Sequence, residues 1–337
     1  MKATKKALAL ILALAMLAGT ISAMATGAPN DPSLVITTVM ENGAVAVTGA
    51  DFAAESNISF RAFYTAPGGR LDLSDYDYID QYRTDAAGGF QASYATSKEF
   101  QIGGTVTVVV AGGGLAAPLQ AEATILPTLP TVAVTNTRAR PGGEFSVDVV
   151  LYNNPGIASM RLFLEFDDEL FTLESVEDAG VLGGAFHYEF EESPASPYTL
   201  YWETDSTQNV TANGAVAKLN FTASESTRVA PYVIGVSYDE LDIVNSDEKA
   251  VDFRVASGGV NVIIVYGNVS GTLDDPSSAD SVLLTRYLAN WPGIVIFKPA
   301  ADVDLDTRIT PRDSLILRRH LAKWDNYLTL PIPLIQN

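Results

Sequence analysis

The spacing of apolar residues changes once along this chain of 337 residues, and that change limits the folds the chain can adopt. From about Ser33 to Ile264, β-branched and aromatic residues alternate with polar ones in short runs that end in glycine-rich turns. Such alternation is typical of half-buried strands. After Tyr266 the apolar spacing becomes helical, in two separate amphipathic runs. The sequence therefore predicts a mainly β protein that ends in a small α-helical module.

The first 25 residues predict a secretory signal peptide. A positively charged start (Lys2, Lys5 and Lys6) precedes an apolar run over residues 7–18, and an A-x-A cleavage pattern follows at residues 23–25. A membrane anchor is the alternative, but the apolar run is too short to span a bilayer. We therefore expect a secreted, extracellular protein without a membrane span.

The charge of the remaining chain excludes several functions. Residues 1–25 hold three of the 21 Lys and Arg and none of the 40 Asp and Glu, so the rest carries a formal net charge of −22. Such acidity argues against nucleic-acid binding and suits a hard cation such as Ca²⁺. The chain has no Cys, its two His lack a second ligand at metal spacing, and no Gly-rich phosphate loop precedes a helix. We expect neither disulfides nor enzymatic activity.

Residues 26–126 are expected to form the first of two β-sandwiches, and a proline-punctuated linker follows at 127–130. Runs such as NISFRAFYTA and TVTVVVAGGG resemble the immunoglobulin-like modules that are common in secreted bacterial proteins. The segment is rich in tyrosines, which suit half-buried strands but could also stack on sugars. A carbohydrate-binding protein is therefore the alternative function. The tyrosines in question are Tyr64, Tyr76, Tyr78, Tyr82 and Tyr94.

The two helical runs are copies of one another. SADSVLLTRYLANW and TPRDSLILRRHLAKW align at an offset of 33 residues, and each follows a loop rich in oxygen-bearing side chains. A duplicated loop–helix unit explains this most economically. The aligned pairs are Asp280 and Asp313, Leu284 and Leu317, Arg286 and Arg319, Leu288 and Leu321, and Trp291 and Trp324.

The second loop has the spacing of a 12-residue calcium loop. Oxygen ligands fall at alternate positions, and a carboxylate closes the loop at the start of the helix. Its sharp turn normally carries glycine, but here Thr307 occupies that position. A β-branched residue with positive φ is strained by roughly 1–3 kcal/mol. The predicted ligands are Asp302, Asp304, Asp306, the backbone carbonyl of Arg308, Thr310 through a water molecule, and Asp313.

The first loop is poorer in carboxylates. Asn268, Ser270 and Thr272 hold the alternating positions, and Asp280 closes a loop that is one residue longer. With a single carboxylate at the regular positions, this loop should bind calcium weakly or not at all, unless Asp274 or Asp275 turns inward.

Residues 266–330, with two loops that each lead into D-S-x-x-L-x-R-x-L-A-x-W, resemble a type I dockerin. The resemblance implies a calcium-dependent module that binds a cohesin. The implied contact positions differ between the two copies, which argues against the dual symmetric binding inferred for many dockerins. These positions are Ser278, Ala279, Thr285, Arg286, Pro311, Arg312, Arg318 and Arg319.

Residues 131–264 resemble a cohesin, the receptor for dockerins. The resemblance is carried by Pro141-Gly142, by the NNPGI and FLEFDDELFTLESVE blocks, and by the GAVAKLNF and SGGVNV strands. It implies a nine-stranded jelly-roll sandwich with one flat face that binds a dockerin. An immunoglobulin-like sandwich without a partner is the alternative. The candidate contact residues are Asn153, Asn154, Glu165, Asp167 and Asp205.

Taken together, the two resemblances imply a non-catalytic adaptor scaffoldin in a cellulosome or at a cell surface. Its cohesin would receive dockerin-bearing proteins such as polysaccharide-degrading enzymes. Its own dockerin, ordered by Ca²⁺, would dock onto a cohesin of another scaffoldin.

Overall fold

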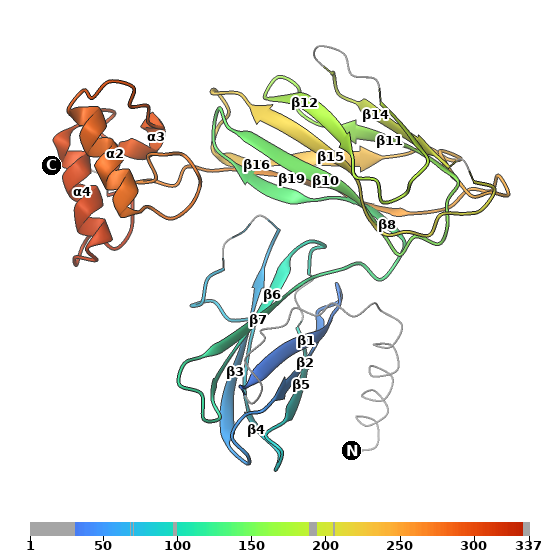
Figure 1. Cartoon of the computed structure of the whole chain (residues 1–337), viewed down its shortest axis with the longest axis horizontal. Helices are drawn as coiled ribbons and strands as arrows, with labels where there is room; N and C mark the ends of the chain where they lie inside the picture. Colours follow the sequence, from blue (N-terminus) through green and yellow to red (C-terminus); the bar gives the residue numbers. More distant parts are fainter. Residues whose placement is uncertain are drawn as a thin grey trace.

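The structure is a computed structural model that describes residues 31–67, 69, 71–96, 100–188, 194–204 and 206–332. The predicted signal peptide, residues 1–25, lies outside this part of the chain. Two β-sandwiches follow one another, and a small helical module in orange and red forms the C-terminal end (Figure 1). The prediction of a mainly β protein with a helical end is confirmed.

The first sandwich consists of two antiparallel sheets. One sheet has the strand order β1-β2-β5, and the other has the order β4-β3-β6-β7. Alternate residues of each strand point inward, so the apolar positions of both sheets meet in one core. Its membership of an immunoglobulin-like family stays a prediction. The strands are β1 (Ser33–Val39), β2 (Ala44–Ala50), β3 (Asn57–Thr65), β4 (Tyr78–Arg83), β5 (Phe90–Ala95), β6 (Thr105–Gly112) and β7 (Leu119–Thr124).

Most of the tyrosines singled out in the sequence pack on this core rather than forming a sugar-binding platform. The rings of Tyr78 and Tyr94 stack with centroids 4.4 Å apart and an interplanar angle of 7°. Only Tyr76 of this group is largely exposed, at 48%. Half-buried strand positions account for the others, which are Tyr64, Tyr78, Tyr82 and Tyr94.

The second sandwich also has two sheets, of strand orders β12-β15-β10-β8-β18 and β13-β14-β11-β16-β19-β9, with β17 paired to β11. Its core includes Trp202, whose side chain is almost fully buried. The strands are β8 (Thr131–Val134), β9 (Asn136–Ala139), β10 (Glu144–Tyr152), β11 (Ser159–Glu165), β12 (Phe171–Asp178), β13 (Ala185–Tyr188), β14 (Tyr198–Glu203), β15 (Gly214–Ala223), β16 (Ala230–Ser237), β17 (Ile243–Val244), β18 (Arg254–Ala256) and β19 (Gly258–Val262).

The first and last strands of this sandwich each cross from one sheet to the other. β8 pairs in parallel with β18 in one sheet, and β9 pairs in parallel with β19 in the other. The crossing divides both strands into two segments, and β17 adds a short edge segment. The described residues therefore contain twelve strand segments in this domain instead of the nine strands that the resemblance implied.

The helical module reproduces the duplication seen in the sequence. Its three helices are α2 (Ser278–Leu288), α3 (Lys298–Ala301) and α4 (Pro311–Leu321). The two long helices begin and end 33 residues apart, and each begins with a capping box that uses the carboxylate of Asp280 or Asp313. Leu284 and Leu317 are fully buried between them. Helices α2 and α4 have 11 residues each, and among the described residues no helix has the length and apolarity to cross a membrane.

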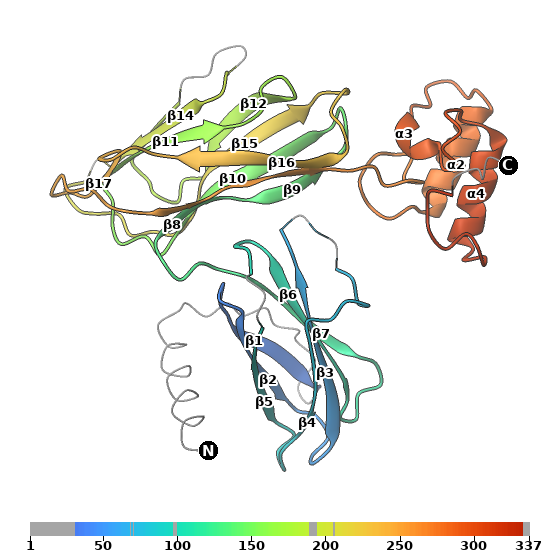
Figure 2. The same cartoon turned by 180° about the vertical axis from the view of Figure 1, so that it is seen from behind.

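Figure 2 shows the three modules from behind, and side-chain contacts join neighbouring modules. Between the sandwiches, Glu41 forms an ion pair with Arg254 and accepts a hydrogen bond from the hydroxyl of Thr128 in the linker. Between the second sandwich and the helical module, the guanidinium of Arg140 lies 4.9 Å from the ring centroid of Phe297. The linker at 127–130 is therefore held by the first sandwich, and the helical module contacts the second sandwich directly.

Candidate functional site

Three carboxylates of the second loop converge. One oxygen each of Asp302, Asp304 and Asp306 lies within 4.8 Å of the others. Asp304 is fully buried, and its two neighbours are partly exposed. Hard oxygen ligands at this separation suit a divalent cation such as Ca²⁺.

Backbone hydrogen bonds shape this loop around its first carboxylate. The two oxygens of Asp302 accept hydrogen bonds from the N–H groups of Asp306 and Thr307, at 3.1 and 2.9 Å. The chain turns sharply here, with φ of 57° at Leu305 and 70° at Thr307. The expected positive φ at Thr307 is confirmed, and a branched side chain at such a φ is strained.

One oxygen in the cluster lacks a hydrogen-bond donor. Asp304 Oδ2 is buried and accepts no hydrogen bond, although Nε of Arg312 lies 3.0 Å away in an ion pair. Burial, together with the charges of Asp313 and Asp306, raises the pKa of the Asp304 carboxyl above its ordinary value. A buried carboxylate oxygen without a donor, beside two further carboxylates, fits a cation as its missing partner.

Asp313, the predicted closing ligand, lies outside the converging group of three. Its oxygens accept hydrogen bonds from the N–H groups of Val303 and Thr310, at 3.0 and 2.8 Å. It therefore holds the start of the loop against the start of α4. Thr310 is the N-cap of that helix, and Arg308 is exposed and donates its N–H to the carboxylate of Asp306.

The first loop closes around a side-chain amide. Asn268 Oδ1 accepts hydrogen bonds from the N–H groups of Gly271 and Thr272, at 2.8 and 3.2 Å. Asn268 Nδ2 donates to Thr272 Oγ1 at 3.0 Å and to the carbonyl oxygen of Asp274 at 2.8 Å. Ser270 donates its hydroxyl to Asn268 Oδ1, and Asp280 caps α2. The sequence identified these ligand positions but not the role of the amide, which the Asn itself could have suggested.

Most of the predicted contact positions on the helical module are exposed. Arg318 and Thr285, at equivalent positions of the two copies, are joined by a hydrogen bond of 2.8 Å across the helix pair. Sequence reasoning missed Val282 and Leu315, another equivalent pair, which are 50% and 46% exposed. Their apolar character at outward helical positions in both copies was the available signal. The other exposed positions are Ser278, Ala279, Arg286, Pro311 and Arg312, and Arg319 is half-buried.

Two of the contact residues predicted on the second sandwich, Asn153 and Asn154, make hydrogen bonds within the chain. Asn154 is 7% exposed, and its amide nitrogen donates to the carbonyl groups of Val210 and Ala212. Asn153 donates to the carbonyl of Pro127 and so holds the linker. The assignment of Asn154 is corrected, because its buried amide is used within the fold, whereas Asn153 is exposed and its contact role stays a prediction. Glu165 and Asp167 are exposed near the end of β11, and Asp205 lies outside the described residues.

The outer faces of the two sheets differ in character. The sheet that contains β11, β14 and β16 presents Phe163, Tyr201 and Val233 outward, and Val233 is 69% exposed. On the opposite sheet, charged residues such as Glu177 and Lys218 face each other across β12 and β15. Exposed apolar side chains within a polar surround mark the first of these faces as the candidate interaction surface.

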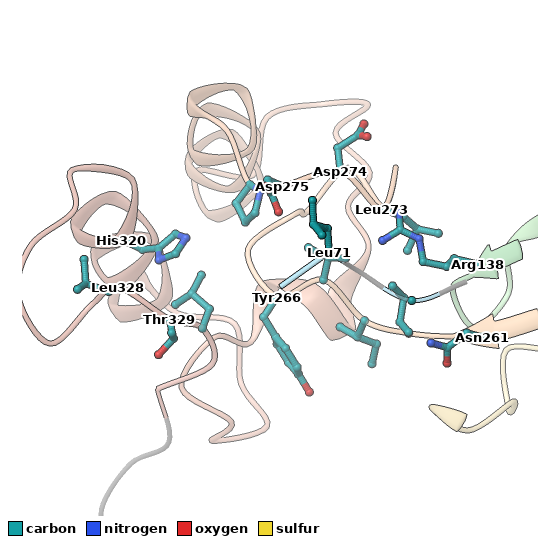
Figure 3. A pocket seen from close by; sticks show the side chains of 16 residues that line it. Leu71, Arg138, Asn261, Tyr266, Leu273, Asp274, Asp275, His320, Leu328 and Thr329 are labelled. Carbon is teal, nitrogen blue, oxygen red and sulfur yellow. The ribbon is translucent and has the colours of Figure 1, made fainter. Parts of the chain in front are cut away.

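A cleft of about 950 Å³ lies where the three modules meet. The first loop, with Leu273 and Asp274, forms one wall, and the side chain of Arg138 of the second sandwich extends toward Leu273 (Figure 3). Leu71 of the first sandwich and Tyr266 also line the cleft. The cleft places the first loop at a junction between modules, whereas the second loop is not among its lining residues.

The middle domain belongs to a recognisable class, a two-sheet sandwich with jelly-roll character and one partly apolar outer face. Residues 130–262 match the family model described as the cohesin domain. The chain therefore contains a cohesin domain, as the sequence predicted. Among curated proteins, no match to the chain is found.

Solved cohesin structures resemble the chain at low identity. The third cohesin of ScaC from Acetivibrio cellulolyticus, in complex with the ScaB dockerin, is 22% identical, with a TM-score of 0.36 over 40% of this chain and 99% of that chain. A type I cohesin–dockerin complex from Clostridium thermocellum is 18% identical, with a TM-score of 0.34 over 40% and 100%. A non-cellulosomal cohesin from Archaeoglobus fulgidus is 16% identical, with a TM-score of 0.35 over 40% and 92%.

Proposed function

We propose that the protein is a secreted adaptor scaffoldin with two binding functions. Its cohesin domain would bind dockerin-bearing proteins, and its helical module would act as a dockerin for a cohesin on another scaffoldin. The observation that carries the proposal is the presence on one chain of a cohesin domain and a duplicated loop–helix module with three converging carboxylates. Cohesin domains are non-catalytic interaction modules, so no enzymatic activity is proposed.

The receiving surface of the cohesin is proposed to be the outer face of β11, β14 and β16. Val233 is exposed on β16 near the end of β11, and Phe163 on β11 and Tyr201 on β14 face outward further along the same face. Aromatic and aliphatic side chains of this kind form the centre of protein interfaces, whereas a face of alternating charges is easily solvated.

Capture of dockerin-bearing proteins by the purified chain tests this assignment. Val233→Asp should reduce capture by at least about tenfold, because it places a charge in an apolar contact. Thr172→Asp, an exposed change on β12 of the opposite sheet, is the matched control and should bind normally. If both variants lost capture equally, or if neither lost it, this face would not be the receiving surface.

The docking function is proposed to depend on Ca²⁺ held by Asp302, Asp304 and Asp306. When bound, the ion would supply the positive charge that allows these three carboxylates to lie together. The buried, donor-less oxygen of Asp304 supports this choice. The loop and α4 would then present the exposed helix positions to the partner.

Binding of the full chain to a panel of cohesins, in calcium and in chelator, tests the calcium dependence. Asp304→Asn should remove the calcium-dependent binding, and Asp274→Asn, an exposed carboxylate of the first loop, should leave it intact. Undiminished binding in chelator would contradict the calcium requirement. Sedimentation of the chain alone would show whether its dockerin binds its own cohesin.

Secretion, at a cellulosome or cell surface, is proposed from the N-terminal pattern and is tested by locating the mature protein in culture supernatant. Carbohydrate binding stays an alternative prediction, and the inward packing of four of the five tyrosines does not favour it. Affinity electrophoresis on soluble polysaccharides would separate the two, because an adaptor without a sugar site shows no retardation.

A further inference from the structure

The two loops of the helical module share one backbone shape. When Asn268 is aligned with Asp302, Gly271 and Leu305 both have positive φ, at 76° and 57°. Two positions further along each loop, Leu273 and Thr307 also both have positive φ, at 67° and 70°. The one-residue insertion therefore falls after this turn, and the first seven positions of the loops correspond.

The same positions are anchored in the same way. Val269 and Val303 follow the first loop position and are both fully buried. Each gives its carbonyl oxygen to a backbone N–H beyond the following helix, from Phe297 in the first copy and Ile332 in the second, at 2.8 Å in both. Since the backbone and its anchors agree, the chemical difference between the loops lies in their side chains.

In the first loop, an amide makes the contacts that a cation would otherwise make. Asn268 Nδ2 donates to the side-chain oxygen at the fifth position, Thr272 Oγ1, and to the carbonyl oxygen at the seventh, that of Asp274. These are two of the oxygen positions through which such a loop binds calcium. The reverse orientation of the amide is excluded, because Nδ2 would then face the N–H groups of Gly271 and Thr272.

The aligned side chain of the second loop cannot do this. Asp302 has only acceptor atoms, and both of its oxygens are already used by backbone N–H groups. No donor reaches the buried Asp304 Oδ2, and the nearest positive group is the guanidinium of Arg312 at its edge. The hydrogen-bonding groups of the first loop are thus satisfied by its own neutral side chains and backbone. The second loop keeps three carboxylates close together.

We infer that the helical module binds one divalent cation, in the second loop, and that the Asn268 amide replaces the cation in the first. This inference rests on the proposed calcium site of the second loop. Asn268 is 2% exposed and its amide is fully hydrogen-bonded, so a cation entering the first loop would have to displace two donated hydrogen bonds. The first loop therefore keeps its shape without metal, and the second is ordered by it.

Hydrogen exchange of the full chain, followed by mass spectrometry with and without calcium, resolves the two loops separately. Calcium at about 100 times its dissociation constant should slow exchange of segment 302–313 by up to about 100-fold, if exchange requires release of the ion. Segment 268–280 should change less than about twofold, because no ion is released there. Equal slowing of both segments would overturn the inference.

Exchanging the key side chains provides a second test. Asp302→Asn gives the second loop the amide of the first, so segment 302–313 should exchange more slowly in chelator than in the wild-type chain and should no longer respond to calcium. Asn268→Ala removes the amide, so segment 268–280 should exchange faster, by the same factor with and without calcium. If calcium restored the protection of the Asn268→Ala loop, an ion and not the amide would be organising it.

The outcomes separate this inference from the proposed function. Slowing of both segments by calcium would overturn the single-ion inference while supporting calcium-dependent docking. Slowing of neither segment would overturn the calcium part of the proposed function, and the single-ion inference with it. Titration calorimetry with calcium checks the number of bound ions. The wild-type chain should bind one ion more than the Asp302→Asn chain.

Discussion

The two loops of the helical module have nearly the same backbone but different chemistry. Both turn through residues with positive φ, both are anchored by a buried valine, and both lead into helices of 11 residues. The first is closed by the amide of Asn268, whereas the second gathers three carboxylates. We infer from this comparison that backbone and apolar anchors keep the loop shape, while one side chain sets whether the loop needs a cation.

The largest expected effects concern the apolar core that the two copies of the module share. Leu284→Ala and Leu317→Ala each remove a fully buried side chain at equivalent positions of α2 and α4. Each should lower the free energy of unfolding of the module by about 2–5 kcal/mol. Thermal unfolding in calcium, followed by hydrogen exchange within residues 266–332, measures this. Losses that differ by more than about 2 kcal/mol would show that the two copies do not share the core equally.

Changes at the third loop position should affect calcium binding differently in the two copies. Asp304→Ser gives the second loop the residue of the first and removes the buried carboxylate, so calcium affinity should fall by at least about 100-fold, or about 2.7 kcal/mol. Ser270→Asp makes the reverse change, and it should create no second site while the Asn268 amide remains. Calorimetric titration with calcium measures both. A second bound ion in Ser270→Asp would break the proposed asymmetry.

Arg312 offers a smaller effect that exists in one copy only, since Ala279 occupies the equivalent position of α2. Its guanidinium lies beside Asp304 Oδ2 and competes with a cation for that oxygen. Arg312→Gln should raise calcium affinity by about three- to tenfold, or roughly 0.7–1.4 kcal/mol. Arg318→Gln, which loses a hydrogen bond to Thr285 instead, is the control and should leave affinity unchanged. Lower affinity in Arg312→Gln would mean that the arginine supports the site.

The smallest expected effect concerns strain in the turn. Thr307→Gly should relieve the strain of a β-branched residue at a φ of 70°, partly offset by the greater freedom of glycine in the unfolded chain. We expect calcium binding to tighten by a few tenths to about 1 kcal/mol. Thr307→Ser keeps the positive φ without glycine and should bind no more tightly than wild type. Weaker binding in Thr307→Gly would show that the threonine side chain itself helps the site.

Much of the architecture could be predicted from the sequence. The change of apolar period located the end of the β domains, the offset of 33 residues located the paired helices, and the spacing of Asp302, Asp304 and Asp306 located the carboxylate cluster. Periodicity and spacing are local properties, because a strand or a loop repeats its burial pattern every few residues. The prediction of a cohesin over residues 131–264 is also confirmed, since the family match covers residues 130–262.

The roles of individual polar side chains depended on tertiary structure. Asn153 and Asn154 were predicted to contact a partner, but they bond to carbonyl groups of the linker and of the segment around Val210. Such pairings join residues more than 20 positions apart, so no local pattern shows them. The tyrosines of the first sandwich show the same dependence: the sequence left half-buried and sugar-stacking roles open, and the packing of two sheets decides which side chains face the core.

The sequence by itself determined that the module is duplicated and that one loop is richer in carboxylates than the other. It left open whether the poorer loop was a weak metal site or an altered one. The tertiary structure supports an altered loop, because it directs the Asn268 amide toward Thr272 and Asp274, whereas Asp304 Oδ2 in the second loop is buried without a hydrogen-bond donor. Hydrogen bonds depend on the direction of each donor and acceptor, and only the folded backbone sets those directions.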